Sequence, residues 1–143
     1  MKKITLLFFV FTFFIIQAQN TSTPLITLPS GDTVQFEVNG TTNLVTMTMT
    51  LPENDWLAIG LDASGMGSSN KDVIVYDSSG IQDRYLNGYV TPQLDNTQDW
   101  AISSNTVSNS VRTVIATRTL NEANIHEHLP ACSHLHAVSG GSN

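Results

Sequence analysis

Apolar and polar residues alternate one by one over residues 44–51, and this period of two strongly limits the possible fold. Three threonines fall on one face, and the other face carries four apolar side chains: Val45, Met47, Met49 and Leu51. Successive side chains of a strand point to opposite faces, so this pattern is typical of a half-buried β-strand. Residues 33–38 alternate in the same way, and Asn39-Gly40 between the two runs is a strong hairpin signal. We therefore predict two paired antiparallel strands here.

Other short runs divided by turn signals are typical of strands. They are residues 25–28, 56–61, 73–76, 81–86, 99–103 and 111–118. Residues 87–98 are expected to form a polar loop and residues 105–110 a polar turn region. No sustained helical period occurs beyond the N-terminal segment. Seven or eight short strands without intervening helices predict an all-β fold, an antiparallel Ig-like β-sandwich.

The first 19 residues are typical of a secretory signal peptide. Lys2 and Lys3 precede a continuous apolar run over residues 4–16, and small or polar residues around Ala18 end it. The run is short for a membrane span, although a retained N-terminal anchor is the alternative. We expect a protein that is secreted or exported to the cell surface or periplasm, with no stable membrane span in the mature chain.

The mature chain is expected to be strongly acidic. Without the first 19 residues, four basic minus twelve acidic residues give a net charge of −8. Such a domain repels phosphate backbones, which argues against a nucleic-acid partner. The single cysteine, Cys132, excludes an internal disulfide framework. Neither a Gly-x-Ser-x-Gly elbow nor a His-Glu-x-x-His motif is present, so we do not expect an enzyme.

The chain changes character after Arg118. No apolar run of strand length follows, and all four histidines lie with Cys132 in HEHLPACSHLH, residues 126–136. We expect a sandwich domain over residues 20–124 that lacks its last strands, and a His-rich tail over residues 125–143 that is disordered or artefactual. A frameshift or truncation near Asn124 and a genuine short form both fit. The cluster also suits copper or zinc, since imidazole and thiolate bind both.

Residues 56–76 form the unit on which a binding site would depend. A short run suited to a strand buried on both faces, residues 56–61, leads into a loop of small residues, and residues 73–76 close the unit. Met66 is the large apolar residue of this loop, between Gly65 and Gly67, which let the backbone approach a bulky neighbour. A thioether either fills a gap in the core or ligates haem iron. Both readings stay open on spacing alone.

Three segments in order resemble the DOMON family, the module named after dopamine β-monooxygenase. They are WLAIGLDASGMGSSNKDVIVY (residues 56–76), IQDRYLNGYVTPQLDNTQDW (residues 81–100) and VRTVIATRTLNEAN (residues 111–124). The resemblance implies two antiparallel sheets that hold a ligand between them. In the branch similar to the cytochrome domain of cellobiose dehydrogenase, the ligand is haem b, with iron held by a Met from the loop after the Trp strand and a His from a late strand.

On this resemblance, Met66 and His136 are the candidate iron ligands, and the implied function is electron transfer or redox sensing with a partner protein or domain. Arg118 is a candidate partner of a haem propionate, because guanidinium pairs with carboxylates; alternatively it is an edge residue or pairs with Asp83. Trp56 and Tyr76 are expected to be core residues, and Asp72 a strand-start or loop-capping residue. The alternative function is a haem-free module that binds carbohydrate or cell-surface glycans.

Overall fold

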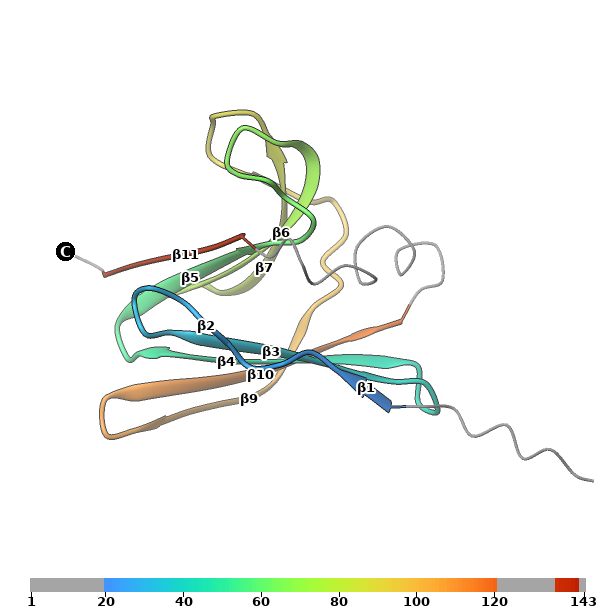
Figure 1. The fold of residues 1–143 in the computed structure, drawn as a ribbon, viewed down its shortest axis with the longest axis vertical. Helices are drawn as coiled ribbons and strands as arrows, with labels where there is room; N and C mark the ends of the chain where they lie inside the picture. Colours follow the sequence, from blue (N-terminus) through green and yellow to red (C-terminus); the bar gives the residue numbers. More distant parts are fainter. Residues whose placement is uncertain (1–19, 121–135, 142–143) are drawn as a thin grey trace, which may run out of the picture.

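The computed structural model describes residues 20–120 and the backbone of residues 136–141, which form two antiparallel β-sheets facing each other (Figure 1). The six-stranded sheet has the order β1-β3-β4-β10-β9, with β2 paired to β3. Its strands are β1 (Asn20–Ser22), β2 (Ile26–Thr27), β3 (Thr33–Asn39), β4 (Leu44–Pro52), β9 (Ala101–Ser108) and β10 (Val111–Thr119). This sheet contains both runs of clean alternation.

The five-stranded sheet has the order β11-β5-β6-β7-β8. Its strands are β5 (Asp55–Gly60), β6 (Ser69–Asp77), β7 (Gly80–Asn87), β8 (Gln93–Leu94) and β11 (His136–Gly141). The predicted all-β sandwich of antiparallel sheets is confirmed. Within the described ranges, no helix is long and apolar enough to cross a membrane.

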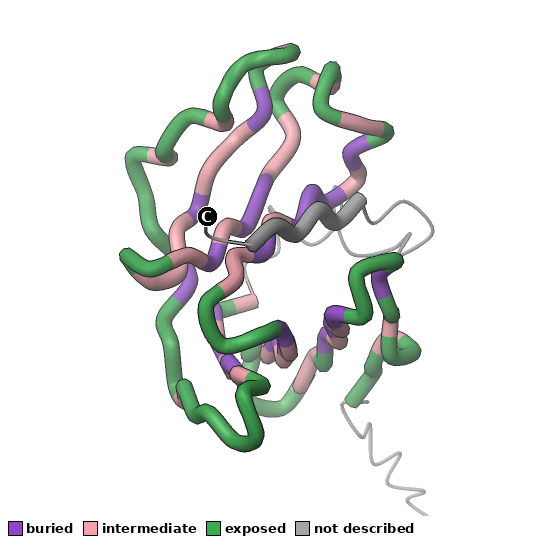
Figure 2. The backbone as a smooth tube through the Cα atoms, turned by 90° about the vertical axis from the view of Figure 1, so that its left-hand side faces the viewer, coloured by how far each residue is buried: buried purple, intermediate pink, exposed green. Residues whose placement is uncertain are grey.

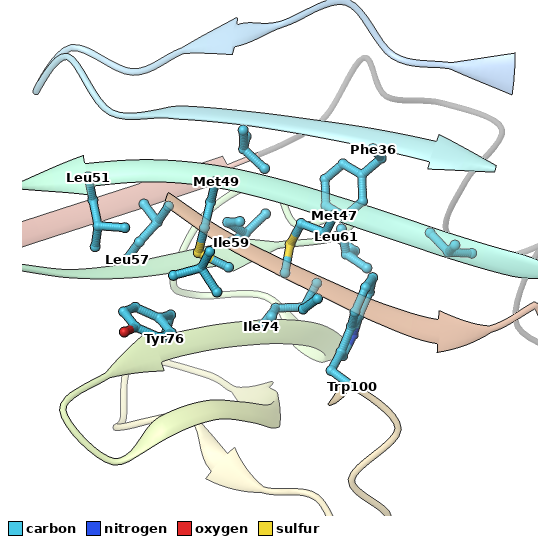
Figure 3. Packing of buried hydrophobic residues seen from close by; sticks show 14 of the residues in the cluster. Phe36, Met47, Met49, Leu51, Leu57, Ile59, Leu61, Ile74, Tyr76 and Trp100 are labelled. Atoms are coloured by element: carbon cyan, nitrogen blue, oxygen red, sulfur yellow. The ribbon is translucent and has the colours of Figure 1, made fainter. Parts of the chain in front are cut away.

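The core lies between the sheets, where the apolar sides of the alternating strands meet (Figure 3). β4 places Met47 and Met49 there, both almost fully buried, while the alternating threonines Thr46, Thr48 and Thr50 stay half-buried on the other face. From the opposite sheet, β5 contributes Leu57 and Ile59. Backbone tubes coloured by burial show buried stretches gathered in the strands and exposed ones in the loops (Figure 2). Each strand therefore divides its residues between two faces, as the period of two requires.

The predicted hairpin at Asn39-Gly40 is confirmed, with a longer turn than two residues. Asn39 pairs with Leu44 at the end of the β3–β4 ladder. The Asn39 Oδ1 atom accepts hydrogen bonds from the backbone N–H groups of Thr41 and Thr42, both at 3.0 Å. The side chain thus caps the turn, which is a usual role for asparagine in turns.

The prediction of a polar turn over residues 105–110 is wrong. β9 continues to Ser108 and pairs with β10 along its length, so the turn is confined to Asn109 and Ser110. Both turn residues have positive φ, 52° and 61°, as the two-residue turn that suits twisted hairpins requires. The strand predicted over residues 99–103 covers only the start of β9. The sequence pattern did not reveal its continuation because β9 is almost wholly exposed, and backbone pairing at the sheet edge holds it without an apolar face.

The expectation that the sandwich ends at β10 is also wrong. β11 covers His136–Gly141, within the predicted tail, and pairs antiparallel with β5 from His136↔Gly60 to Gly141↔Asp55. Six residues with two glycines carry little apolar signal, so periodicity could not identify this strand. Residues 1–19 and 121–135 lie outside the described residues, and with them the predicted signal peptide, His126, His128, Cys132 and His134.

Candidate ligand-binding cavity

A cavity of about 590 Å³ lies on the outer side of the five-stranded sheet, away from the core. Its floor comes from residues of β5, β6 and β7 that alternate with core residues. On β5, Trp56, Ala58 and Gly60 line the cavity, whereas Leu57 and Ile59 point into the core. The resemblance implied a ligand site between the two sheets. That expectation is wrong, because the cavity lies on the outer face of one sheet. The same alternation accounts for the position, because one sheet face is already used by the core.

The floor of the cavity is apolar. Val73 and Leu86 are almost fully buried beside Ala63, and Ala58 and Val75 pack against them. All five side chains line the cavity. They form a small hydrophobic cluster separate from the main core. This face of the sheet therefore suits the apolar part of a ligand.

Polar and flexible residues make the rim. The turn before β5 contributes Asn54, and β5 begins with Asp55. β6 ends with Asp77, and the turn after it contributes Ser78. On the opposite side, the loop after β5 contributes Met66, and the segment after β7 contributes Thr91 and Pro92. The prediction that Trp56 is a core residue is wrong, because it lies half-buried in the wall of this cavity. Tyr76 is confirmed in the core, where its hydroxyl accepts a hydrogen bond from Asn105 at 3.0 Å.

The Met66 loop is held at both ends by hydrogen bonds and an ion pair. Leu61 N–H donates to the Asp72 carbonyl at 2.9 Å, and Ser68 N–H donates to the Gly65 carbonyl at 3.1 Å. Lys71 of β6 forms an ion pair with Asp62. The loop backbone is thereby closed on itself, and Met66 stands at its tip with 46% of its surface exposed. The interpretation that Met66 fills a gap in the core is therefore wrong.

Gly67 allows another loop to dock on the Met66 loop. A Cβ atom at this position would lie 2.7 Å from Cζ of Tyr89, closer than side-chain carbons approach in proteins. Tyr89 belongs to the segment after β7 and is 89% exposed. The predicted close approach of a bulky neighbour at a flanking glycine is confirmed here, and it joins the two loops that form one side of the rim.

Arg84 is a cavity residue that the sequence analysis missed. It lines the wall from β7, where its Nη1 donates to the Pro92 carbonyl at 2.7 Å and its Nε donates to Gln82 Oε1 at 2.8 Å. Its Nη2 donates to the same Gln82 oxygen. The signal was present, since Arg84 and Leu86 are two residues apart on one strand and must share a face.

Arg118 lies elsewhere. It is 7% exposed, between the sheets, with its guanidinium carbon 5.0 Å from the centroid of the Trp100 ring. Trp100 in turn makes an edge contact with Phe36, with ring centroids 6.3 Å apart. The structure therefore places Arg118 in the core and outside the cavity lining, so it does not bring Arg118 together with Met66.

Arg118 shares its surroundings with Asp83, which the sequence analysis named as its alternative partner. Burial, and next the carboxylate of Asp72, raise the pKa of Asp83 to about 6, while Arg118 acts to lower it. Asp83 is only 6% exposed. The expectation that Asp72 starts a strand is wrong, because β6 begins at Ser69 and Asp72 lies three residues further along it, where its carboxylate acts on Asp83 of β7.

His136 reaches the cavity region through backbone pairing. It is the first residue of β11 and stands opposite Gly60, which lines the cavity. Gly60 pairs with Val73, and Val73 pairs with Arg84, so these four positions form one row across the sheet. Strands are about 4.8 Å apart, which sets the positions of His136 and Arg84 roughly 14 Å from each other. In residues 20–120 and 136–141, no group of three or more His, Cys, Asp or Glu is arranged to hold a metal ion.

The fold and this cavity define a class: a two-sheet β-sandwich with a ligand-sized cavity on the outer face of one sheet. The cytochrome domain of cellobiose dehydrogenase from Myriococcum thermophilum is similar in structure, with a TM-score of 0.51 and 15% sequence identity. The match covers 70% of this chain and 54% of that domain, so the chain spans about half of its neighbour's length. No protein-family profile and no curated protein matches the sequence. The likeness shows a shared β-sandwich fold.

Proposed function

We propose that this protein is an exported haem-binding module that transfers or senses electrons and has no catalytic activity of its own. The observation that carries the proposal is the place of Met66, whose half-exposed thioether stands at the rim of an apolar cavity of about 590 Å³. Cavities of 300–1,000 Å³ are typical of small-molecule and cofactor sites. The similar cytochrome domain supports the choice of cofactor.

The residues of the cavity suit haem b. Val73, Val75 and Leu86 offer an apolar surface on which a porphyrin face would lie, and they keep water from it. Met66 and His136 are the proposed iron ligands, the first from the loop and the second from the edge strand beside Gly60. With a thioether and an imidazole as its iron ligands, haem would supply one-electron transfer at a raised potential.

The test is reconstitution of the chain with haem b, followed by absorption spectra of the reduced protein. We expect a sharp low-spin α-band, and we expect Met66→Ala to weaken or abolish it because the thioether ligand is lost. Met49→Leu is the matched control, since Met49 is buried in the core and lies outside the cavity. A Met66→Ala spectrum identical to that of the unchanged protein would refute ligation by Met66.

A haem-free glycan-binding module is the second candidate. One end of the cavity presents Trp56, whose ring is apolar and whose Nε1 donates, beside the carboxylates of Asp55 and Asp77. This combination also suits sugar hydroxyl groups. Binding of the apoprotein to a glycan array, abolished by Trp56→Ala and unaffected by Met66→Ala, would favour this candidate over haem.

A further inference from the structure

We infer that Arg84 makes the cavity selective for ligands that carry a carboxylate. Arg84 would bind this carboxylate at the end of the cavity near Met66. The inference rests on the proposed function, because it concerns the same cavity. It assigns the anion-binding role to Arg84, whereas the candidate named with the family resemblance was Arg118, which the structure buries against Trp100.

The first argument is how Arg84 is held. Its three hydrogen bonds within the described residues go to the side chain of Gln82 and the carbonyl of Pro92, and both acceptors are neutral. The guanidinium group has five N–H donors in a planar fork. Those bonds use three donors and orient the plane, which leaves two donors for a ligand. A half-buried cation set by neutral acceptors retains its attraction for an anion.

The second argument is that the other basic side chains face elsewhere. Lys71 pairs with Asp62, and Arg112 donates to the Glu53 carbonyl and to Asn105. Arg118 lies over Trp100. Among the side chains that the structure describes in the cavity lining, Arg84 is thus the one basic group. The mature chain has a net charge of −8 and repels anions in general. Inside the cavity, an anionic ligand group is therefore attracted to Arg84.

The third argument is the separation of charge along the cavity. Arg84 of β7 pairs with Val73 of β6, and Asp77 lies four residues after Val73 in β6. At about 3.3 Å per residue, that is roughly 13 Å, which exceeds the Debye length of about 8 Å at physiological salt. The cavity therefore has a cationic end near Met66 and an acidic end at Asp55 and Asp77. A ligand with carboxylates on one side is oriented by these two ends.

The test compares metal-free protoporphyrin IX with its dimethyl ester, using porphyrin fluorescence to measure the dissociation constants. Neither compound contains iron, so Met66 and His136 make no ligand bond in this experiment. We expect the full chain to bind the diacid about tenfold more tightly than the diester, and Arg84→Gln to remove this preference. Arg84→Lys, which keeps the charge without the fork, should retain part of it.

Arg112→Gln is the control, because it removes the same charge from the other sheet. Circular dichroism melts of each variant check that the Arg84 contact with Pro92 is not needed for folding. Equal binding of diacid and diester by the unchanged protein, or a preference that survives in Arg84→Gln, would overturn the inference while leaving haem binding intact. If the chain binds neither these porphyrins nor haem b, the proposed function itself fails and the inference fails with it.

Discussion

At the residue scale, the buried carboxyl group of Asp83 is the clearest source of pH dependence. Its pKa is raised from 3.8 to about 6, first by burial and then by Asp72. The folded state therefore holds the proton more tightly than the unfolded chain. The stability that this adds is fully present below pH 3.8 and is lost as the pH rises through about 6.

The matching prediction concerns the free energy of unfolding of Asp83→Asn. A shift of about two pKa units corresponds to at most about 3 kcal/mol between the two limits. We expect the unchanged protein to gain stability from pH 7 toward pH 4.5 relative to Asp83→Asn, whose amide does not titrate. Urea unfolding at several pH values measures the difference. Parallel pH profiles for the two proteins would contradict the shift.

At the scale of elements, the two rim loops are coupled through Gly67 and Tyr89. Atoms of the Tyr89 ring lie 2.7 and 2.8 Å from the position of a Cβ atom at Gly67, so a side chain there must displace the ring. Because Tyr89 is 89% exposed, the ring can move into solvent. A methyl group at this position therefore shifts the loop more than it lowers the free energy of unfolding.

We predict that Gly67→Ala lowers the free energy of unfolding by less than about 1 kcal/mol, as expected of an exposed site. It should also weaken ligand binding, because the loop that carries Met66 loses its contact. Tyr89→Ala with Gly67→Ala tests the cause: in the Tyr89→Ala background, the added methyl group should have little further effect on binding. Additive effects of the two substitutions would show that the loops are not coupled.

At the scale of the whole molecule, the five-stranded sheet has two apolar faces, one for the core and one for the cavity. The six-stranded sheet uses its inner face for the core, while the five-stranded sheet also carries Val73 and Leu86 on its outer face. β5 is central to this division, and β11 covers its otherwise unpaired edge. The last strand is therefore part of the sandwich and supports the floor of the cavity.

Truncation after residue 135 tests this role of β11. Loss of the strand removes six residue pairs along β5, and an uncovered strand edge promotes association with other chains. We expect a lower melting temperature, concentration-dependent aggregation and loss of haem binding. A truncation of only residues 142–143, which leaves β11 complete, is the control. An unchanged melting temperature in the longer truncation would mean that β11 adds nothing to the fold.

Much of the fold was predictable because alternation records burial directly. β3, β4 and β10 lie where the period of two placed them, within a residue or two at each end. Most of β9 beyond Ser103 and all of β11 were not predicted, since β9 is exposed and β11 is rich in glycine, so the alternation of apolar and polar residues does not mark them. Met66 was identified through its loop and the family resemblance. Arg84 was missed because an arginine in a strand is usually solvated. Only the residues around it in the folded chain show that it lines a cavity.

The sequence by itself determined the class of fold, the core of β3 and β4, and the glycine-flanked Met66. Those features are local, since a period of two and a turn signal act between residues close in the chain. Tertiary structure alone decided on which face of the sheet the cavity lies, that Arg84 and not Arg118 lines it, and that β11 closes β5. The physical reason is that each depends on pairing between strands distant in sequence, which no short window of residues contains.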